Sequence, residues 1–150
     1  LIDNNIRIEV IGDTDALPEE TKGILNSAIE DTKHCTGMVL NFALNYGSRQ
    51  EITSAVKNII TEIQNDNIDI NDVSEDLINK HLMTSRYNEF SDPDLIIRTS
   101  GEERLSNFLL WQAAYSEFYF TDVLWPDFNE DELDKAIKTY NGRQRRFGKI

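Results

Sequence analysis

Two arginines and a serine follow a short apolar run in the stretch of sequence that is richest in possible chemistry. Arg98 closes the run 95–97, and Arg104 and Ser106 stand shortly after it. Guanidinium groups bind phosphate oxygens in a bidentate manner, and the first N–H groups of a helix attract anions. A helix that begins after Ser106, together with the backbone amides of the turn 100–101, would therefore form a site for a phosphate or diphosphate.

An ordinary structural explanation fits the same residues. Glu102 and Glu103 lie between the two arginines, and arginines beside glutamates commonly form local ion pairs on solvated turns. Ser106 would then act only as a helix cap. The spacing favours neither interpretation, so both stay open at this stage.

Glu117 is the second candidate, because it is a charged residue in apolar surroundings. It follows the mainly apolar run 108–114 and stands between Tyr115 and Phe118. A carboxylate in such a place is usually paired with a cation or binds one, and Mg²⁺ takes one or two carboxylates together with substrate phosphate oxygens. On the residues alone, an ion pair with a nearby arginine is the favoured interpretation.

The corner around Gly47 is the third candidate. Glycine permits a sharp turn from strand to helix, and Asn45 and Arg49 would face a ligand from its two sides. The simpler interpretation is a turn followed by a helix cap, since Ser48 and Glu51 have capping-box spacing. Taken alone, the sequence favours the turn and the cap.

Alternating strand and helix patterns position these candidates. The predicted strands cover residues 6–12, 38–44, 95–97 and 118–125. One predicted helix has Pro18 in its first turn, and the others cover 48–63, 75–82, 107–115 and 129–140. The nearly continuous apolar run 38–44 predicts a central strand that is covered on both faces. This alternation indicates an α/β fold with a mostly parallel sheet flanked by helices. Ligands of such sheets lie beyond the carboxyl ends of the strands, here residues 12–13, 45–47 and 98–101.

Length, charge and cysteine content exclude several classes of protein. The chain has 150 residues, 39% of them hydrophobic and 28% charged, which is typical of one globular domain. Its net charge of −12 argues against nucleic-acid binding through bulk charge. The single cysteine, Cys35, excludes a disulfide framework. His34 and His81 lack further ligands at zinc-binding spacing, and no apolar run approaches the ~20 residues of a membrane helix.

Five motifs in order, and the ending of the chain, resemble the cis-prenyltransferases, and among these the bacterial undecaprenyl diphosphate synthases. The motifs are LNFALNYGSR (40–49), DLIIRTSGE (94–102), RLSNFLLWQ (104–112), YSE (115–117) and LWPDF (124–128), and the ending is RQRRFG (143–148). The resemblance covers nearly the whole chain. It implies an α/β enzyme that condenses isopentenyl diphosphate units onto an allylic diphosphate, usually farnesyl diphosphate, with cis double bonds. For the bacterial enzymes the product would be undecaprenyl diphosphate, the precursor of a lipid carrier for cell-wall synthesis.

The resemblance also implies roles for individual residues. Arg98, Arg104 and Ser106 would hold isopentenyl diphosphate, Glu117 would help to place Mg²⁺, and Asn45 would lie near the reacting carbon atoms. The resemblance further implies a cytoplasmic enzyme with no nucleic-acid partner and with peripheral membrane contact through its lipid product.

The ending of the chain implies a partner. Arg146 and Gly148 match the Arg-x-Gly ending of the family, which reaches toward the isopentenyl site of the other subunit in a homodimer. The strand 38–44 is a candidate floor for the apolar tunnel that the growing chain needs, or simply part of the core.

The sequence departs from the family pattern in three places and lacks one segment. Ser48 and Ser100 replace glycine, and Glu103 stands where some relatives have histidine. The opening strand and phosphate loop of the family, with an essential Mg²⁺-binding aspartate, have no counterpart among these residues. We therefore interpret residues 1–150 as the carboxyl-terminal portion of a single cis-prenyltransferase domain and expect it to be inactive alone. The alternative is a non-catalytic interaction subunit of a cis-prenyltransferase complex, against which the retained Arg98 and Glu117 argue.

Overall fold

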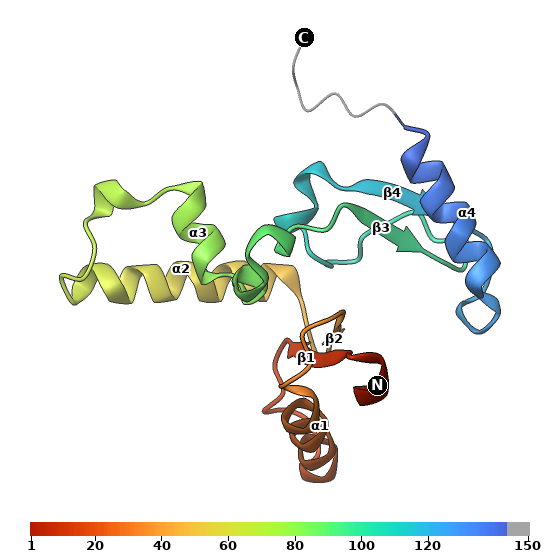
Figure 1. The fold of residues 1–150 in the computed structure, drawn as a ribbon. Helices are drawn as coiled ribbons and strands as arrows, with labels where there is room; N and C mark the ends of the chain where they lie inside the picture. Colours follow the sequence, from red (N-terminus) through yellow and green to blue (C-terminus); the bar gives the residue numbers. More distant parts are fainter. Residues whose placement is uncertain (144–150) are drawn as a thin grey trace. The chain divides into compact units, whose positions relative to one another are not determined.

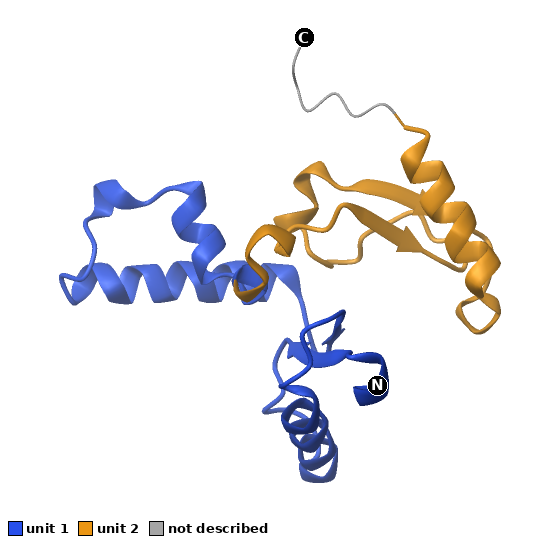
Figure 2. Ribbon diagram, in the orientation of Figure 1, with its two compact units in different colours: residues 1–85 blue, residues 86–150 orange. Residues whose placement is uncertain are grey.

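The computed structural model describes residues 1–143, and residues 144–150 are not described. The chain divides into two compact units, residues 1–85 and residues 86–150 (Figure 2). Each unit contains one pair of parallel strands with helices beside it, which confirms the α/β class with parallel strands. Among the described residues, no helix has both the length and the apolar character needed to cross a membrane.

The first unit is built on the parallel strands β1 (Arg7–Ile11) and β2 (Val39–Ala43). Arg7 pairs with Val39 and Ile11 with Ala43, so both strands end at the same edge. Helix α1 (Glu19–Thr32) connects them (Figure 1). Pro18, which the sequence predicts to lie in the first helical turn, is instead the N-cap just before it. The prediction that β2 is covered on both faces is wrong, because Phe42 is 41% exposed.

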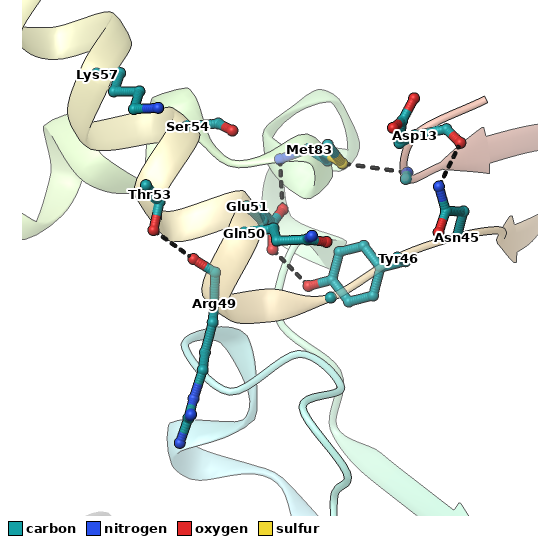
Figure 3. A pocket seen from close by; sticks show the side chains of 12 residues that line it. Asp13, Asn45, Tyr46, Arg49, Gln50, Glu51, Thr53, Ser54, Lys57 and Met83 are labelled. Carbon is teal, nitrogen blue, oxygen red and sulfur yellow. Dashed lines mark hydrogen bonds between the residues drawn. The ribbon is translucent and has the colours of Figure 1, made fainter. Parts of the chain in front are cut away.

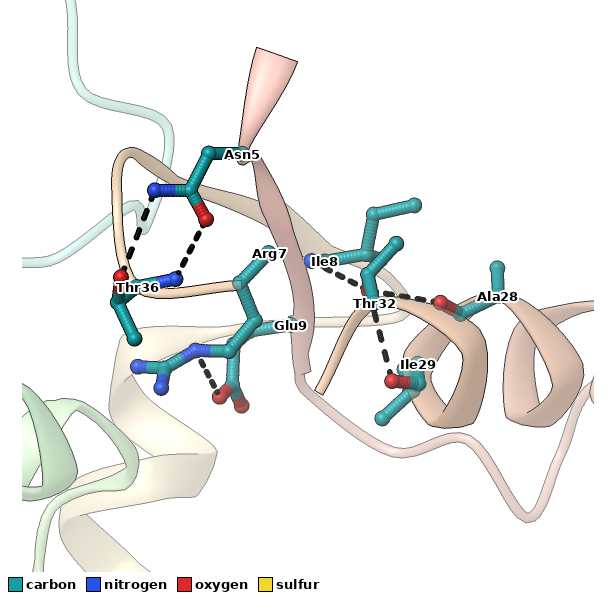
Figure 4. A network of polar contacts seen from close by, with 8 residues as sticks. All are labelled: Asn5, Arg7, Ile8, Glu9, Ala28, Ile29, Thr32 and Thr36. Carbon is teal, nitrogen blue, oxygen red and sulfur yellow. Dashed lines mark hydrogen bonds and ion pairs between the residues drawn. The ribbon is translucent and has the colours of Figure 1, made fainter. Parts of the chain in front are cut away.

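A buried hydroxyl joins the end of α1 to β1. Thr32 Oγ1 accepts a hydrogen bond from the Ile8 backbone N–H at 3.0 Å and donates one to the Ala28 carbonyl at 2.7 Å (Figure 4). Thr32 and Ile8 are 4% and 7% exposed. The contact satisfies the amide of Ile8 away from solvent, where an unpaired donor would be destabilising.

Helices α2 (Ser48–Gln64) and α3 (Glu75–His81) complete this unit and lie beside each other (Figure 1). The predicted capping box at Ser48 and Glu51 is wrong. Gly47 is the N-cap, no side chain caps it, and Ser48 is already the first helical residue. The Glu51 side chain turns into the unit because its neighbours on the same face of α2, Ala55 and Ile59, form the buried stripe.

The second unit is built on the parallel strands β3 (Leu95–Arg98) and β4 (Glu117–Phe120). Helix α4 (Glu130–Asn141) packs on β4 and buries Ala136 completely. The Asn129 side chain caps α4 by accepting a hydrogen bond from the Glu132 backbone N–H at 3.2 Å.

Short 3-10 helices fill much of the connecting chain, and they replace one predicted α-helix. The sequence predicts a helix over 107–115, but only η4 (Gln112–Tyr115) forms there. Ser106, Asn107 and Leu109 have φ angles of 49°, 65° and 45°. A right-handed helix cannot pass through residues in the left-handed region, so turns occupy the start of the segment. The other 3-10 helices are η1 (Ile2–Asn4), η2 (Ile70–Asp72), η3 (Met83–Phe90) and η5 (Trp125–Asp127).

Candidate functional site

A pocket of about 510 Å³ opens beyond the carboxyl ends of β1 and β2 (Figure 3). The sequence predicts a ligand site at this edge, and the structure brings the two predicted loops together there. The lining comes from both loops, from the first turns of α2 and from Met83: Gly12, Asp13, Asn45, Tyr46, Gly47, Arg49, Gln50, Glu51, Thr53, Ser54, Lys57 and Met83.

Asn45 lies in this pocket in a constrained conformation. Its φ is 47°, and its side-chain amide donates a hydrogen bond to the Asp13 carbonyl at 3.2 Å. Gly12 on the facing loop has φ +111°, and a Cβ there would lie 1.9 Å from the Leu44 carbonyl oxygen. The two loops therefore approach each other so closely that only glycine fits at this position.

The sequence does not single out Glu51 as a site residue, yet it is the most buried charged group of the pocket lining, at 2% exposed. One carboxylate oxygen accepts the Met83 backbone N–H at 2.7 Å, and the other accepts the Tyr46 hydroxyl at 2.5 Å. A signal for this arrangement does exist in the sequence. Glu51, Ala55 and Ile59 recur at every fourth position, which puts a charge on the apolar face of a helix.

The second unit places Arg98 and Glu117 at opposite ends of its sheet. Arg98 pairs with Phe120, and Glu117 pairs with Leu95. Arg98 therefore closes β3 at the carboxyl end, as the sequence predicts, whereas Glu117 opens β4 at the other end. Three residue steps along a strand correspond to roughly 10 Å, so this sheet does not bring the two side chains together.

The predicted anion cradle around Arg104 and Ser106 is not formed by backbone amides. The Ser100 N–H donates to the Val123 carbonyl at 2.9 Å, and the Gly101 N–H donates to the Thr121 carbonyl at 3.0 Å. These two amides are already bonded, and no helix begins directly after Ser106. The prediction that backbone N–H groups at these positions bind an anion is therefore wrong.

The arginines of this stretch differ in their partners. Arg104 forms an ion pair with Glu102, as the structural alternative predicts. The Arg98 guanidinium is partly buried and has no side-chain hydrogen bond or ion pair with any residue from 1 to 143. Of the two, Arg98 is the cation that stays available to an anion.

Glu117 pairs with a cation that follows α4. Its Oε2 accepts a hydrogen bond from Arg143 Nη1 at 2.6 Å, and the two side chains are 27% and 37% exposed. Within residues 1–143 no group of three or more histidine, cysteine or acidic side chains could hold a metal ion. A single, partly exposed carboxylate still fits Mg²⁺, because this ion completes its coordination with water and substrate phosphate oxygens. Arg146 and Gly148 lie outside the described residues.

Comparisons with known proteins bear on the whole chain. The Prenyltransf family model, described as "Putative undecaprenyl diphosphate synthase", matches residues 1–148. An isoprenyl transferase of Streptococcus pyogenes is 60% identical over 151 aligned residues, which cover 100% of this chain and 61% of that protein. An isoprenyl transferase of Lactobacillus johnsonii is 53% identical, with 63% of its length covered. The chain thus spans less than two-thirds of the length of these relatives.

Solved structures agree with the sequence comparison. The chain superposes on lavandulyl diphosphate synthase from Lavandula x intermedia, crystallised with dimethylallyl diphosphate, with a TM-score of 0.93 and 39% identity over 96% of this chain and 61% of that one. A probable undecaprenyl diphosphate synthase from Campylobacter jejuni gives a TM-score of 0.81 and 34% identity over 98% of this chain and 65% of that one. With its parallel strands and with matches along nearly its whole length, the chain belongs to the undecaprenyl diphosphate synthase family of prenyltransferases.

Proposed function

We propose that this protein is a cis-prenyltransferase, which condenses isopentenyl diphosphate units onto farnesyl diphosphate to make undecaprenyl diphosphate. The product would be the precursor of a lipid carrier for cell-wall synthesis. The observation that carries the proposal is the position and availability of the Arg98 guanidinium in a chain of this family. It stands at the carboxyl end of β3, where parallel sheets bind ligands, and it has no side-chain partner within residues 1–143.

The proposed substrate contacts follow from charge and position. Arg98 would bind the diphosphate of isopentenyl diphosphate, because a guanidinium fork matches phosphate oxygens. Arg104 is exposed and would exchange its ion pair with Glu102 for a more highly charged diphosphate. The Ser106 hydroxyl is exposed in the same segment and would add one hydrogen bond.

The reaction forms one carbon–carbon bond between the two substrates, breaks the allylic carbon–oxygen bond, and releases diphosphate and a proton. Glu117 would hold Mg²⁺ together with diphosphate oxygens, after release from Arg143. When bound, Mg²⁺ offsets the negative charge that develops on the leaving diphosphate. Asn45 would orient the reacting carbon atoms from the pocket of the first unit.

The partners and the location follow from the same proposal. We expect a homodimer in which Arg146 and Gly148 of one subunit reach the isopentenyl diphosphate of the other. A cytoplasmic enzyme with peripheral membrane contact through its lipid product agrees with these substrates. The net charge of −12 does not oppose diphosphate binding, because the relevant cations are local.

Incorporation of radiolabelled isopentenyl diphosphate tests the proposal. The protein expressed from its complete coding sequence, given farnesyl diphosphate and Mg²⁺, should form long polyprenyl diphosphates. Arg98→Ala should raise KM for isopentenyl diphosphate at least about tenfold, since it removes a charge-assisted contact. Lys138→Ala is the matched control, because it removes an exposed cation from α4 in the same unit. An unchanged KM and kcat in Arg98→Ala would contradict the assignment of the site.

The same assay distinguishes the non-catalytic alternative. An interaction subunit would assemble with a catalytic partner but transfer no prenyl group by itself. The 150-residue chain should also show no transfer by itself, since the family's aspartate-bearing loop has no counterpart among its residues. Measurable turnover by residues 1–150 alone would refute that expectation.

A further inference from the structure

We propose that Glu51 is a positioning residue for prenyl transfer, which acts by holding the loops that follow β1 and β2 in place around Asn45. This inference rests on the proposed function, because it assigns Asn45 to the pocket in which the carbon atoms react. Glu51 itself is 2% exposed and would touch no substrate. Its effect would pass through two neighbours, Tyr46 and Met83.

The surroundings of Glu51 supply hydrogen-bond donors for its buried carboxylate. A carboxylate removed from water is strongly destabilising unless hydrogen-bond donors replace the lost solvent. Here the Met83 backbone N–H and the Tyr46 hydroxyl bind separate carboxylate oxygens, at 2.7 Å and 2.5 Å (Figure 3). The carboxylate therefore ties the start of α2 to the loop after β2 and to the segment after α3.

Met83 extends this connection to the loop after β1. Its sulfur accepts a hydrogen bond from the Gly12 backbone N–H at 3.2 Å. Gly12 is the residue whose φ of +111° and close approach to Leu44 permit no side chain. One buried carboxylate thus fixes, directly or through Met83, both loops that frame the pocket.

Asn45 lies between two parts of the chain that these contacts hold, Tyr46 and the loop after β1. It precedes Tyr46 in the chain, and its side-chain amide donates to the Asp13 carbonyl at 3.2 Å. Its φ of 47° lies in the left-handed region, which a residue other than glycine keeps only where its surroundings hold it. Release of the Tyr46 hydroxyl from Glu51 would remove one of those constraints and let Asn45 leave its orientation.

The decisive variant is Tyr46→Phe in the protein expressed from its complete coding sequence, because it deletes a single hydroxyl and keeps the ring. We expect kcat to fall about tenfold, since misplacement of an orienting group by a fraction of an ångström slows the chemical step. KM for both diphosphates should stay within about twofold, because no proposed diphosphate contact changes. The thermal midpoint should fall by no more than about 4 °C, the effect of losing one hydrogen bond.

Thr61→Val is the matched control. It also deletes one hydroxyl from α2, but outside the pocket lining, and that hydroxyl donates within the helix, to the Lys57 carbonyl at 3.0 Å, so it ties no loop. Its kcat should stay within twofold of the unsubstituted enzyme. Equal losses of kcat in Tyr46→Phe and Thr61→Val would overturn the inference.

Two substitutions of Glu51 add a rescue test. Glu51→Gln keeps the length of the side chain and an oxygen for the Met83 N–H, and its amide can donate to the Tyr46 oxygen, so kcat should stay within about threefold. Glu51→Asp is one methylene shorter and cannot reach both donors, so its kcat should fall at least as far as that of Tyr46→Phe. The opposite ranking would overturn the inference.

The two proposals fail in different ways. An unsubstituted enzyme that transfers prenyl groups, beside a Tyr46→Phe variant with unchanged kcat, overturns only the role of Glu51. An unsubstituted enzyme that shows no transfer overturns the proposed function and the inference with it.

Discussion

Glu51 in the first unit and Glu117 in the second are two carboxylates in opposite surroundings. Glu51 is almost fully buried, and both of its oxygens accept hydrogen bonds. Glu117 is partly exposed and shares one hydrogen bond with Arg143. Exposed ion pairs contribute about 0–1 kcal/mol, whereas the loss of a buried, bonded carboxylate leaves desolvated donors behind. The carboxylate of Glu51 therefore stabilises the fold, whereas the carboxylate of Glu117 can leave Arg143 and bind a ligand at little cost in stability.

The same difference extends to other residues of the two units. In the first unit, Thr32 joins α1 to β1 away from solvent, and Gly12 allows two loops to touch. In the second unit, Arg104 is exposed and Arg98 is partly exposed. Within residues 1–143, Arg104 pairs with Glu102, and the Arg98 side chain forms no ion pair. We expect substitutions in the first group to change stability and substitutions in the second to change ligand binding.

The largest effect should come from Gly12→Ala. The new Cβ would lie 1.9 Å from the Leu44 carbonyl oxygen at a φ of +111°, so the loops must separate. The free energy of unfolding, measured by urea denaturation, should fall by at least about 3 kcal/mol. Gly23→Ala is the control, since a Cβ there meets nothing within 4 Å in α1, and it should stabilise by about 0.5–1 kcal/mol. Similar losses in both variants would contradict the close contact of the two loops.

Glu51→Ala and Glu117→Ala test the comparison directly. Glu51→Ala leaves the Met83 N–H and the Tyr46 hydroxyl without the carboxylate, and should destabilise by about 3 kcal/mol. Glu117→Ala removes a partly exposed ion pair, and should change the free energy of unfolding by less than about 1 kcal/mol. Both values come from urea titration at one pH. A larger destabilisation by Glu117→Ala than by Glu51→Ala would contradict the conclusion that Glu51 is the structural carboxylate.

A pair of threonines gives a smaller effect of the same kind. Thr32→Val keeps the shape of the side chain but leaves the buried Ile8 N–H without an acceptor, which should destabilise by about 1–3 kcal/mol. Thr139→Val deletes a hydroxyl that donates to the Lys135 carbonyl on the exposed face of α4, and should change stability by less than about 0.5 kcal/mol. Thermal unfolding by circular dichroism measures both. A Thr32→Val variant as stable as Thr139→Val would show that the buried contact contributes little.

The smallest expected effect depends on pH and lies between α2 and α3. The Leu77 carbonyl beside His81 Nδ1 raises the pKa of His81 above its ordinary 6.5; burial opposes this, and Glu62, 3.1 Å from Nε2, adds to it. A raised pKa means that protonation favours the folded state. The contribution is therefore fully present below about pH 6.5 and is lost as the pH rises through the higher value of the folded protein.

Glu62→Gln should reveal this dependence. Because Glu62 is 40% exposed, the loss at pH 6 should be no more than about 1 kcal/mol after screening by solvent, and it should be smaller at pH 8.5. Urea titrations at the two pH values measure the difference. Glu19→Gln is the control, since its ion pair with Lys22 contains no histidine. A loss that grows between pH 6 and pH 8.5 would contradict the raised pKa.

Local sequence patterns were sufficient to predict most strands and helices, but not the contacts between them. The strands β1, β2 and β3 and the helices α2, α3 and α4 lie within a few residues of their predicted bounds, because apolar periodicity and caps are local signals. The predicted helix over 107–115 was wrong, since Asn107 and Leu109 have left-handed backbone angles. The predicted capping box at Glu51 was wrong because burial against Met83 and Tyr46 outweighs a local cap.

The sequence by itself determined the family, the α/β class and most of the strands and helices, and it named candidate residues for binding a diphosphate. These follow from residue types at fixed spacing along one chain. Only the tertiary structure decided which of those residues meet. The parallel register of β3 and β4 sets Arg98 and Glu117 at opposite ends of their sheet. The folding of α2 against the rest of its unit buries Glu51 and brings it to the Tyr46 hydroxyl and the Met83 N–H. Contacts between distant residues depend on burial and register, which no local pattern records.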